Sequence, residues 1–200
     1  MIHDVAIAIR RLQRDQKITR AMTLDCDVHQ GNGTAFIFSG PHDPNGMLVS
    51  RELQLNPAQA RVVRSSPERD VFTISLHQEH NYPAWKPHSS IDVNLPDETG
   101  DDEYLSWLDN ALSAGLRQFE PDLLCYVAGA DPYREDQLGG LSLTIEGLMR
   151  RDEFVFRTAH AHDIPVMVTL AGGYAMRLED TITIHCNTVV AAKEVFSATS

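Results

Sequence analysis

Thr23-Leu-Asp-Cys-Asp-Val-His-Gln-Gly-Asn-Gly-Thr34 is the stretch that decides the fold of this chain. An apolar run leads into Asp25, Asp27 and His29, and a single apolar residue separates each of these from the next. Because residues two apart on a strand point to the same side, the three polar side chains can converge at one strand end. The glycines that follow allow a sharp turn. Such a group forms half of a divalent-metal site, although a polar strand end with a glycine turn explains the same pattern.

The rest of the chain alternates apolar strands with helices. Buried strands are predicted at 19–27, 71–77, 123–128 and 166–170, and helices at 5–12, 31–38, 101–119, 144–162 and 178–196. Turn residues predict loops at 39–46 and 79–86. We see neither a linker nor an internal repeat, so residues 1–200 are expected to form one domain. The alternation predicts an α/β fold with a mainly parallel sheet.

Composition limits the classes of function. The 200 residues are 42% hydrophobic and 22% charged, which is ordinary for one globular domain with a sizeable core. The formal net charge of -11 argues against direct binding to nucleic acid or to an anionic membrane. The three cysteines lie far apart and predict neither a disulfide framework nor a cysteine-rich zinc site. Without a signal pattern or an apolar run of spanning length, we expect a cytoplasmic location.

Polar residues recur where the predicted strands end. The second strand ends near Ser75, the third at Asp131 and the fourth in Gly172-Gly-Tyr174. Sites in parallel α/β sheets form beyond these carboxyl ends, so the side chains should share one rim with the first strand. Asp131 would then be a third metal ligand, or else a cap for the turn that follows it. The phenol of Tyr174 would donate to an oxyanion, or else pack over the strand end.

These motifs together resemble a known family. The opening stretch is similar to the metal-binding signature of the zinc-dependent histone deacetylase superfamily, and it is closest to the class IV branch and bacterial relatives. Those proteins have Gln where other branches often have a second His. Further matches follow in the family's order at 71–78, 121–131, 136–144 and 170–174. The resemblance runs from about Asp4 to about Phe196, which is nearly the whole chain.

The resemblance implies a zinc site and a reaction. Asp27, His29 and Asp131 match the family's ligands for one Zn²⁺ per chain, and Tyr174 matches its transition-state tyrosine. The implied fold is deacetylase/arginase-like, with helices on both faces of the sheet. The implied substrate is an acylated lysine or another acylated amine.

Five further residues receive roles only through the resemblance. Asp25 matches a residue that contacts a catalytic histidine, and Asp25, Ser75 and Leu76 match a structural site for a monovalent cation such as K⁺. Gly172 and Gly173 match glycines at the substrate pocket.

One element of the family pattern is missing from the sequence. The family has a His-His pair upstream of a Phe-x-x-Asn-Asp-like segment; here 3–8 matches the end of that segment, with His3 in place of Asn. No two histidines are adjacent anywhere in the 200 residues. We therefore expect an N-terminally truncated domain that lacks the catalytic pair and the first strands. The sheet edge left open would favour self-association.

Three hypotheses follow. The first is a zinc-dependent deacetylase that hydrolyses acyl-lysine or a related acylated amine. The second is a non-catalytic, truncated homologue that binds metal or partners only. The third is an arginase-type hydrolase with two metals, and it is disfavoured because Gly31 stands where the pattern Asp-x-His-x-Asp would place an aspartate.

Overall fold

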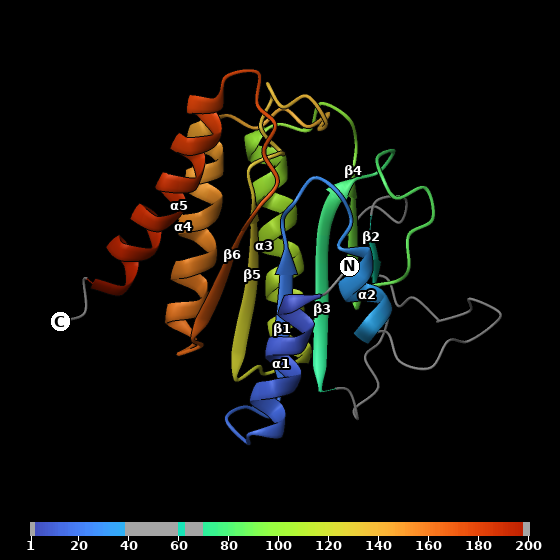
Figure 1. Ribbon diagram of the computed structural model, residues 1–200, viewed down its shortest axis with the longest axis vertical. Helices are drawn as coiled ribbons and strands as arrows, with labels where there is room; N and C mark the ends of the chain where they lie inside the picture. The colour runs from blue at the N-terminus through green and yellow to red at the C-terminus, as the bar shows by residue number, and fades with distance from the viewer. Residues whose placement is uncertain (1–2, 39–59, 63–69, 198–200) are drawn as a thin grey trace.

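The computed structural model describes residues 3–38, 60–62 and 70–197 (Figure 1). Within them, strands form a six-stranded sheet in the order β2-β4-β3-β1-β5-β6. The strands are β1 (Ala21–Asp25), β2 (Ala60–Val62), β3 (Val71–Gln78), β4 (Ile91–Leu95), β5 (Leu123–Gly129) and β6 (Val166–Ala171). β2 is antiparallel to β4, and the other neighbours are parallel. The loop predicted at 39–46 lies outside the described residues.

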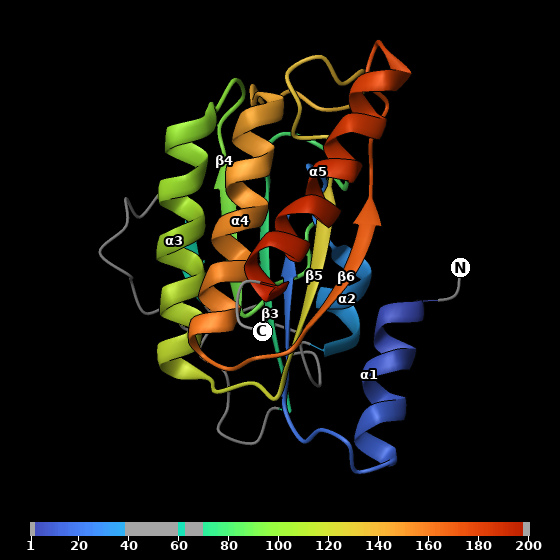
Figure 2. The same ribbon diagram turned by 90° about the vertical axis from the view of Figure 1, so that its left-hand side faces the viewer.

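Helices cover both faces of the sheet, as predicted (Figures 1 and 2). One face carries α1 (Asp4–Arg14) and α2 (Asn32–Phe38), and the other carries α3 (Asp101–Gln118), α4 (Ile145–Ala161) and α5 (Leu178–Ser197). The α/β prediction is therefore confirmed, and every helix predicted from the sequence is present within a few residues of its expected bounds.

The buried strands divide their side chains between two cores. Met22 and Leu24 of β1 belong to the larger core, which includes Leu108 of α3. Ala21 of the same strand belongs to a smaller core with Ile9 of α1. This division follows from the two-residue period of a strand. Because both faces are covered, the strand reads as one apolar run in the sequence, which is typical of parallel sheets.

Two strands were missed in the sequence. β4 has the sequence Ile-Asp-Val-Asn-Leu, and β2 pairs with it at the edge of the sheet. β4 was not recognised because it contains Asp92, and aspartate is depleted from buried strands. In the folded chain Asp92 is buried and its two carboxylate oxygens accept hydrogen bonds from Gln30 Nε2 (3.0 Å) and Ser89 N (2.9 Å). Tertiary hydrogen bonds thus compensate for the cost of burying this carboxylate.

Helix boundaries follow local capping. Thr144 is the N-cap of α4, and its Oγ1 accepts a hydrogen bond from Gly147 N at 2.9 Å. At α1 the cap is His3, whose Nδ1 accepts from Ala6 N at 3.2 Å. The threonines of α5 do not interrupt that helix, because Thr188 is buried and its hydroxyl donates to Asp152 Oδ2 at 2.6 Å.

The far edge of the sheet is open along β6. Within the described residues β6 pairs with β5 alone, and its side chains are half-buried or exposed. Val168 is 37% exposed and Leu170 48% exposed. Self-association through this edge stays a prediction. None of the helices described is long and apolar enough to cross a bilayer.

Candidate metal centre

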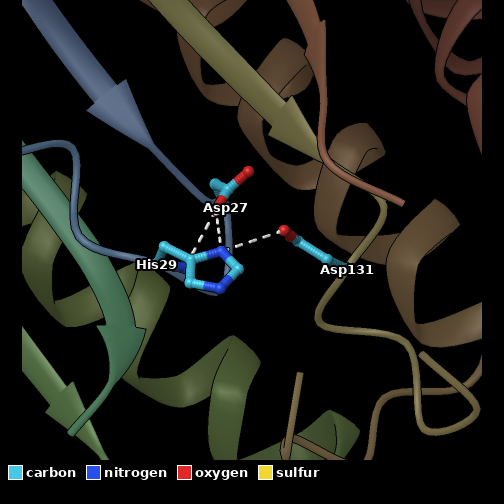
Figure 3. A group of neighbouring side chains, drawn as sticks. All are labelled: Asp27, His29 and Asp131. Atoms are coloured by element: carbon cyan, nitrogen blue, oxygen red, sulfur yellow. Dashed lines mark hydrogen bonds and ion pairs between the residues drawn. The ribbon is translucent and has the colours of Figure 1, made fainter. Parts of the chain in front are cut away.

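Asp27, His29 and Asp131 meet beyond the carboxyl ends of β1 and β5 (Figure 3). One ligand atom from each lies within 4.8 Å of the others. The Nδ1 atom of His29 lies 3.0 Å from Asp27 Oδ1 and 3.3 Å from Asp131 Oδ2. Among the described residues this is the only such group of three or more His, Cys, Asp or Glu side chains. The structure therefore brings together the three ligands that the sequence predicted from two distant segments.

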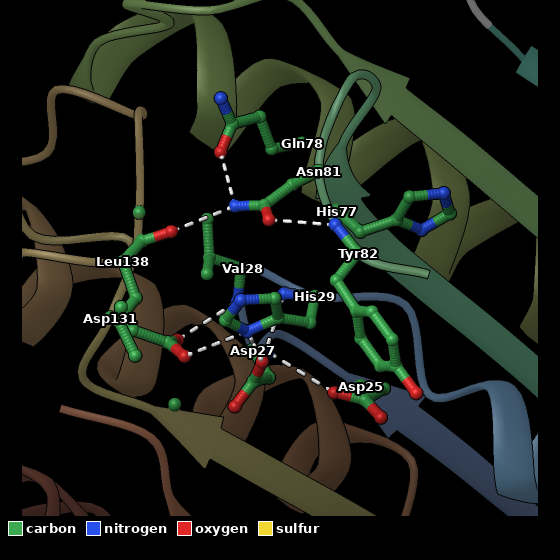
Figure 4. A network of polar contacts seen from close by, with 12 residues as sticks. Asp25, Asp27, Val28, His29, His77, Gln78, Asn81, Tyr82, Asp131 and Leu138 are labelled. Atoms are coloured by element: carbon green, nitrogen blue, oxygen red, sulfur yellow. Dashed lines mark hydrogen bonds and ion pairs between the residues drawn. The ribbon is translucent and has the colours of Figure 1, made fainter. Parts of the chain in front are cut away.

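Aspartate carboxylates accept hydrogen bonds from the backbone of the loop that carries Asp27 and His29 (Figure 4). Asp25 Oδ1 accepts a hydrogen bond from Asp27 N at 3.1 Å, and Asp27 Oδ1 accepts from His29 N at 2.8 Å. These are short local turns in which an aspartate side chain bonds the backbone two residues on. Asp131 Oδ1 accepts from Val28 N at 2.9 Å and so ties the loop to the end of β5. The carboxylates of the candidate ligands Asp27 and Asp131 thus also hold the backbone of the site.

The electrostatics of the group favour a cation. Burial, followed by the charge of Asp27, raises the pKa of Asp25 to about 8. Burial likewise raises the pKa of Asp131 to about 6. Hydrogen bonds to Asp131 and then Asp27 raise the pKa of His29 to about 10. Three carboxyl groups, those of Asp25, Asp27 and Asp131, therefore lie close together, and the donor set of two carboxylates and one imidazole fits Zn²⁺.

Glycines let the backbone approach these carboxylates. A Cβ at Gly31 would lie 2.2 Å from Asp25 Oδ2, and a Cβ at Gly172 would lie 2.4 Å from Asp131 Oδ2. Gly172 also has a φ of +64°, in the left-handed region that favours glycine. The structure has no room for the aspartate that an arginase-type site would need at position 31. This crowding disfavours the two-metal hypothesis.

Tyr174 follows the same glycine turn. Its side chain is 63% exposed, and its backbone N donates to Asp136 Oδ2 at 2.6 Å. The other carboxylate oxygen of Asp136 accepts from Leu138 N and Gly139 N. Asp136 is buried, and through these bonds it fixes the backbone of the rim. Gly173, with a φ of +109°, completes the turn.

The residues predicted for a monovalent-cation site lie on neighbouring strands. Ser75 of β3 pairs in register with Asp25 of β1, and Leu76 follows it. Ser75 Oγ lies 3.0 Å from His77 Nδ1, and both residues are buried. The strand pairing thus places Asp25 and Ser75 at the same level of the sheet.

Sequence reasoning overlooked two polar groups around the site. Asn81 Nδ2 donates to Gln78 Oε1 at 2.8 Å and to Leu138 O at 2.9 Å, and so joins the loops after β3 and β5 (Figure 4). Arg151 is fully buried beside Asp152 in α4. Two adjacent arginines in a helix, here Arg150 and Arg151, usually indicate a solvated face. The sequence therefore did not predict that Arg151 is buried.

Known proteins resemble this chain over most of its length. The sequence model of the histone deacetylase domain matches residues 1–189. The chain is 37% identical to an uncharacterized protein of Picosynechococcus sp., over 98% of this chain and 56% of the relative. It is 31% identical to histone deacetylase 2 of Arabidopsis thaliana, over 86% of this chain and 38% of the relative.

A solved structure shares the fold. It is an acetylpolyamine aminohydrolase from Burkholderia pseudomallei, with a TM-score of 0.69 and 24% identity, over 97% of this chain and 50% of that one. The chain therefore spans 38–56% of the length of these three proteins. Because the family's sequence model covers nearly all of its residues, this protein belongs to the histone deacetylase domain family.

Proposed function

We propose that this domain takes part in zinc-dependent hydrolysis of acyl-lysine or a related acylated amine. The observation that carries the proposal is the convergence of Asp27, His29 and Asp131 within 4.8 Å. Three protein ligands leave one position of a tetrahedral zinc open, as catalytic zinc sites require. Family membership supports an acylated substrate. The names of two relatives, a histone deacetylase and an acetylpolyamine aminohydrolase, point in the same direction.

The three ligands would hold Zn²⁺, which when bound supplies a Lewis acid for the substrate carbonyl and for water. Tyr174 would donate its phenol hydrogen to the oxyanion that develops on that carbonyl. Its exposed side chain and its position two residues after Gly172, which packs on Asp131, support this role. Gly172 and Gly173 would form the adjacent wall of the pocket.

Asp25 would act on the loop rather than on the substrate. It is buried against Gly31 and accepts the Asp27 amide, so it holds the ligand loop in place. The register of β1 and β3 supports a structural K⁺ near Asp25, Ser75 and Leu76 as part of the same proposal.

A second candidate is metal binding without turnover. The observation in its favour is the absence of adjacent histidines from the 200 residues. A positioned general base contributes roughly 10²–10⁴-fold to such reactions. A chain that binds zinc but lacks this base would hydrolyse substrate slowly or not at all.

The test uses the purified 200-residue chain. Metal content is quantified, and hydrolysis is followed with an acetyl-lysine peptide and with an acetylated polyamine. The deacetylase proposal predicts one zinc per chain and hydrolysis that a chelator, Tyr174→Phe or Asp131→Ala abolishes. Asp102→Ala is the matched control, since that aspartate lies on the surface of α3. Zinc without turnover supports the second candidate, and a chain that binds no zinc contradicts both.

A further inference from the structure

A buried ion pair lies beneath the candidate metal centre. Arg151 and Asp152 of α4 are both 0% exposed. Arg151 Nε donates to Asp152 Oδ1 at 2.9 Å, and Nη2 lies 2.8 Å from the same oxygen. The hydroxyls of Tyr126 and Thr188 donate to this carboxylate at 2.5 Å and 2.6 Å. Burying two charges is costly, and an apolar pair of similar volume is often at least as stable. A contribution to stability is therefore a weak explanation for the pair.

The other side of the guanidinium faces the strand ends. Arg151 Nη1 donates to Gly129 O at 2.7 Å and to Cys26 O at 3.3 Å. Cys26 directly precedes the ligand Asp27, and Gly129 lies two residues before the ligand Asp131. One nitrogen thus contacts the carbonyl of Gly129, the last residue of β5, and the carbonyl of Cys26, the residue that follows β1.

These contacts lie where regular strand pairing has stopped. The paired register of β1 and β5 ends at Asp25 and Val127. Beyond it, Cys26 N still donates to Val127 O at 3.1 Å, and Val28 N donates to Asp131 Oδ1 at 2.9 Å. Between these two hydrogen bonds, Arg151 bonds the carbonyl groups of Cys26 and Gly129. Its fixed, planar set of donors suits two carbonyls on one side and a carboxylate on the other.

We propose that Arg151, neutralised by Asp152, is a positioning residue that sets the spacing between the ligands on β1 and the ligand on β5. The part of this proposal that concerns zinc affinity rests on the proposed function. The part that concerns the spacing of the strand ends does not. Arg151 acts through the backbone of Cys26 and Gly129 and touches neither metal nor substrate.

The test compares variants of the whole 200-residue chain. Arg151→Met with Asp152→Asn removes both charges, and the asparagine keeps hydrogen-bonding atoms for Tyr126 and Thr188. Arg151→Lys keeps the charge but loses the planar set of donors. Arg150→Met is the matched control, since Arg150 is an exposed neighbour on the same helix that pairs with Asp102 at 3.0 Å.

Two quantities are measured for each folded variant. The first is zinc affinity, by competition with a chromophoric chelator. The second is amide hydrogen exchange of Val28, relative to Leu124 at the opposite end of β5, in metal-free protein. We expect the double variant to bind zinc about 10–100-fold more weakly, the usual effect of removing a group that orients metal ligands. Its Val28 amide should exchange at least about tenfold faster, as expected when local opening becomes easier.

Arg151→Lys should shift both quantities in the same direction, and Arg150→Met should change neither. Wild-type zinc affinity and wild-type Val28 exchange in a folded Arg151 variant would overturn the proposal. If the double variant does not fold, Arg151→Lys decides in its place. If the unsubstituted chain binds no zinc, the proposed function fails, while the exchange of Val28 still decides the positioning role.

Discussion

Gly172→Ala tests whether the backbone approach to Asp131 builds the metal centre. The new Cβ would lie 2.4 Å from Asp131 Oδ2, 2.5 Å from Cγ and 2.7 Å from Oδ1, whereas ordinary contact begins at 3.4 Å. The carboxylate would have to retreat by about 1 Å to reach normal packing. Such a movement breaks the hydrogen bond from Val28 N to Asp131 Oδ1, now 2.9 Å long.

Two effects lower the free energy of unfolding of Gly172→Ala. An alanine in the left-handed conformation of Gly172 costs about 1–2 kcal/mol. Loss of the hydrogen bond from Val28 to a buried Asp131 oxygen costs about 1–3 kcal/mol. The free energy of unfolding should therefore fall by about 2–5 kcal/mol. For a chain of this length the melting temperature would drop on the order of 10 °C. Zinc affinity should fall about 10–100-fold, because one ligand has moved.

Urea unfolding and chelator competition measure the two effects. Gly100→Ala is the control, since a Cβ at Gly100 would meet nothing within 4 Å and its φ is -94°. That variant should keep its zinc affinity and lose less than about 1 kcal/mol, as expected for a change at a helix N-cap. Wild-type stability and wild-type zinc affinity in Gly172→Ala would refute the reasoning.

Three further outcomes are expected. Gly31→Asp creates the arginase-type pattern, but the variant should bind no second metal. It should be destabilised by about 1–3 kcal/mol, because the new Cβ would lie 2.2 Å from Asp25 Oδ2. Two metals per chain in elemental analysis would contradict this expectation. Leu170→Lys, at a 48% exposed position on the β6 edge, should reduce the self-association of the chain in sedimentation velocity, and an unchanged monomeric profile for both proteins would count against edge pairing. In thiol titration the exposed Cys186 should react quickly in the native state, whereas burial raises the pKa of Cys26 to about 12, so that thiol should react only after denaturation.

Much of the fold could be predicted because its signals are local. Apolar runs marked four of the five parallel strands, β1, β3, β5 and β6, and 3.6-residue periodicity marked the helices. A strand ended earlier than predicted where a side chain, rather than the neighbouring strand, bonds the backbone. The first strand was expected to reach Asp27 but ends at Asp25, since the Asp25 side chain accepts the Asp27 amide and turns the chain away. β4 was missed because its buried Asp92 bonds Gln30, 62 residues away in the sequence, as well as the nearby Ser89 amide, and the distant contact leaves no local signal.

The candidate site also has residues that could be predicted from the sequence and residues that could not. The chain order of Asp27, His29 and Asp131 predicted that these side chains meet, because parallel strands bring their carboxyl ends to one edge of the sheet. The structural role of Asp136 was not predictable, since nothing in a charged loop reveals that its carboxylate will accept three backbone amides.

The sequence by itself determined the family, the strand and helix types and the identity of the candidate ligands, since these depend on residue type, spacing and order along the chain. Only the tertiary structure decided how closely those ligands approach and what holds them there. The contacts of Arg151 with Cys26 and Gly129 span 125 and 22 residues of sequence. Whether a charged side chain is solvated or buried against distant carbonyl groups depends on packing between elements, which local sequence does not encode.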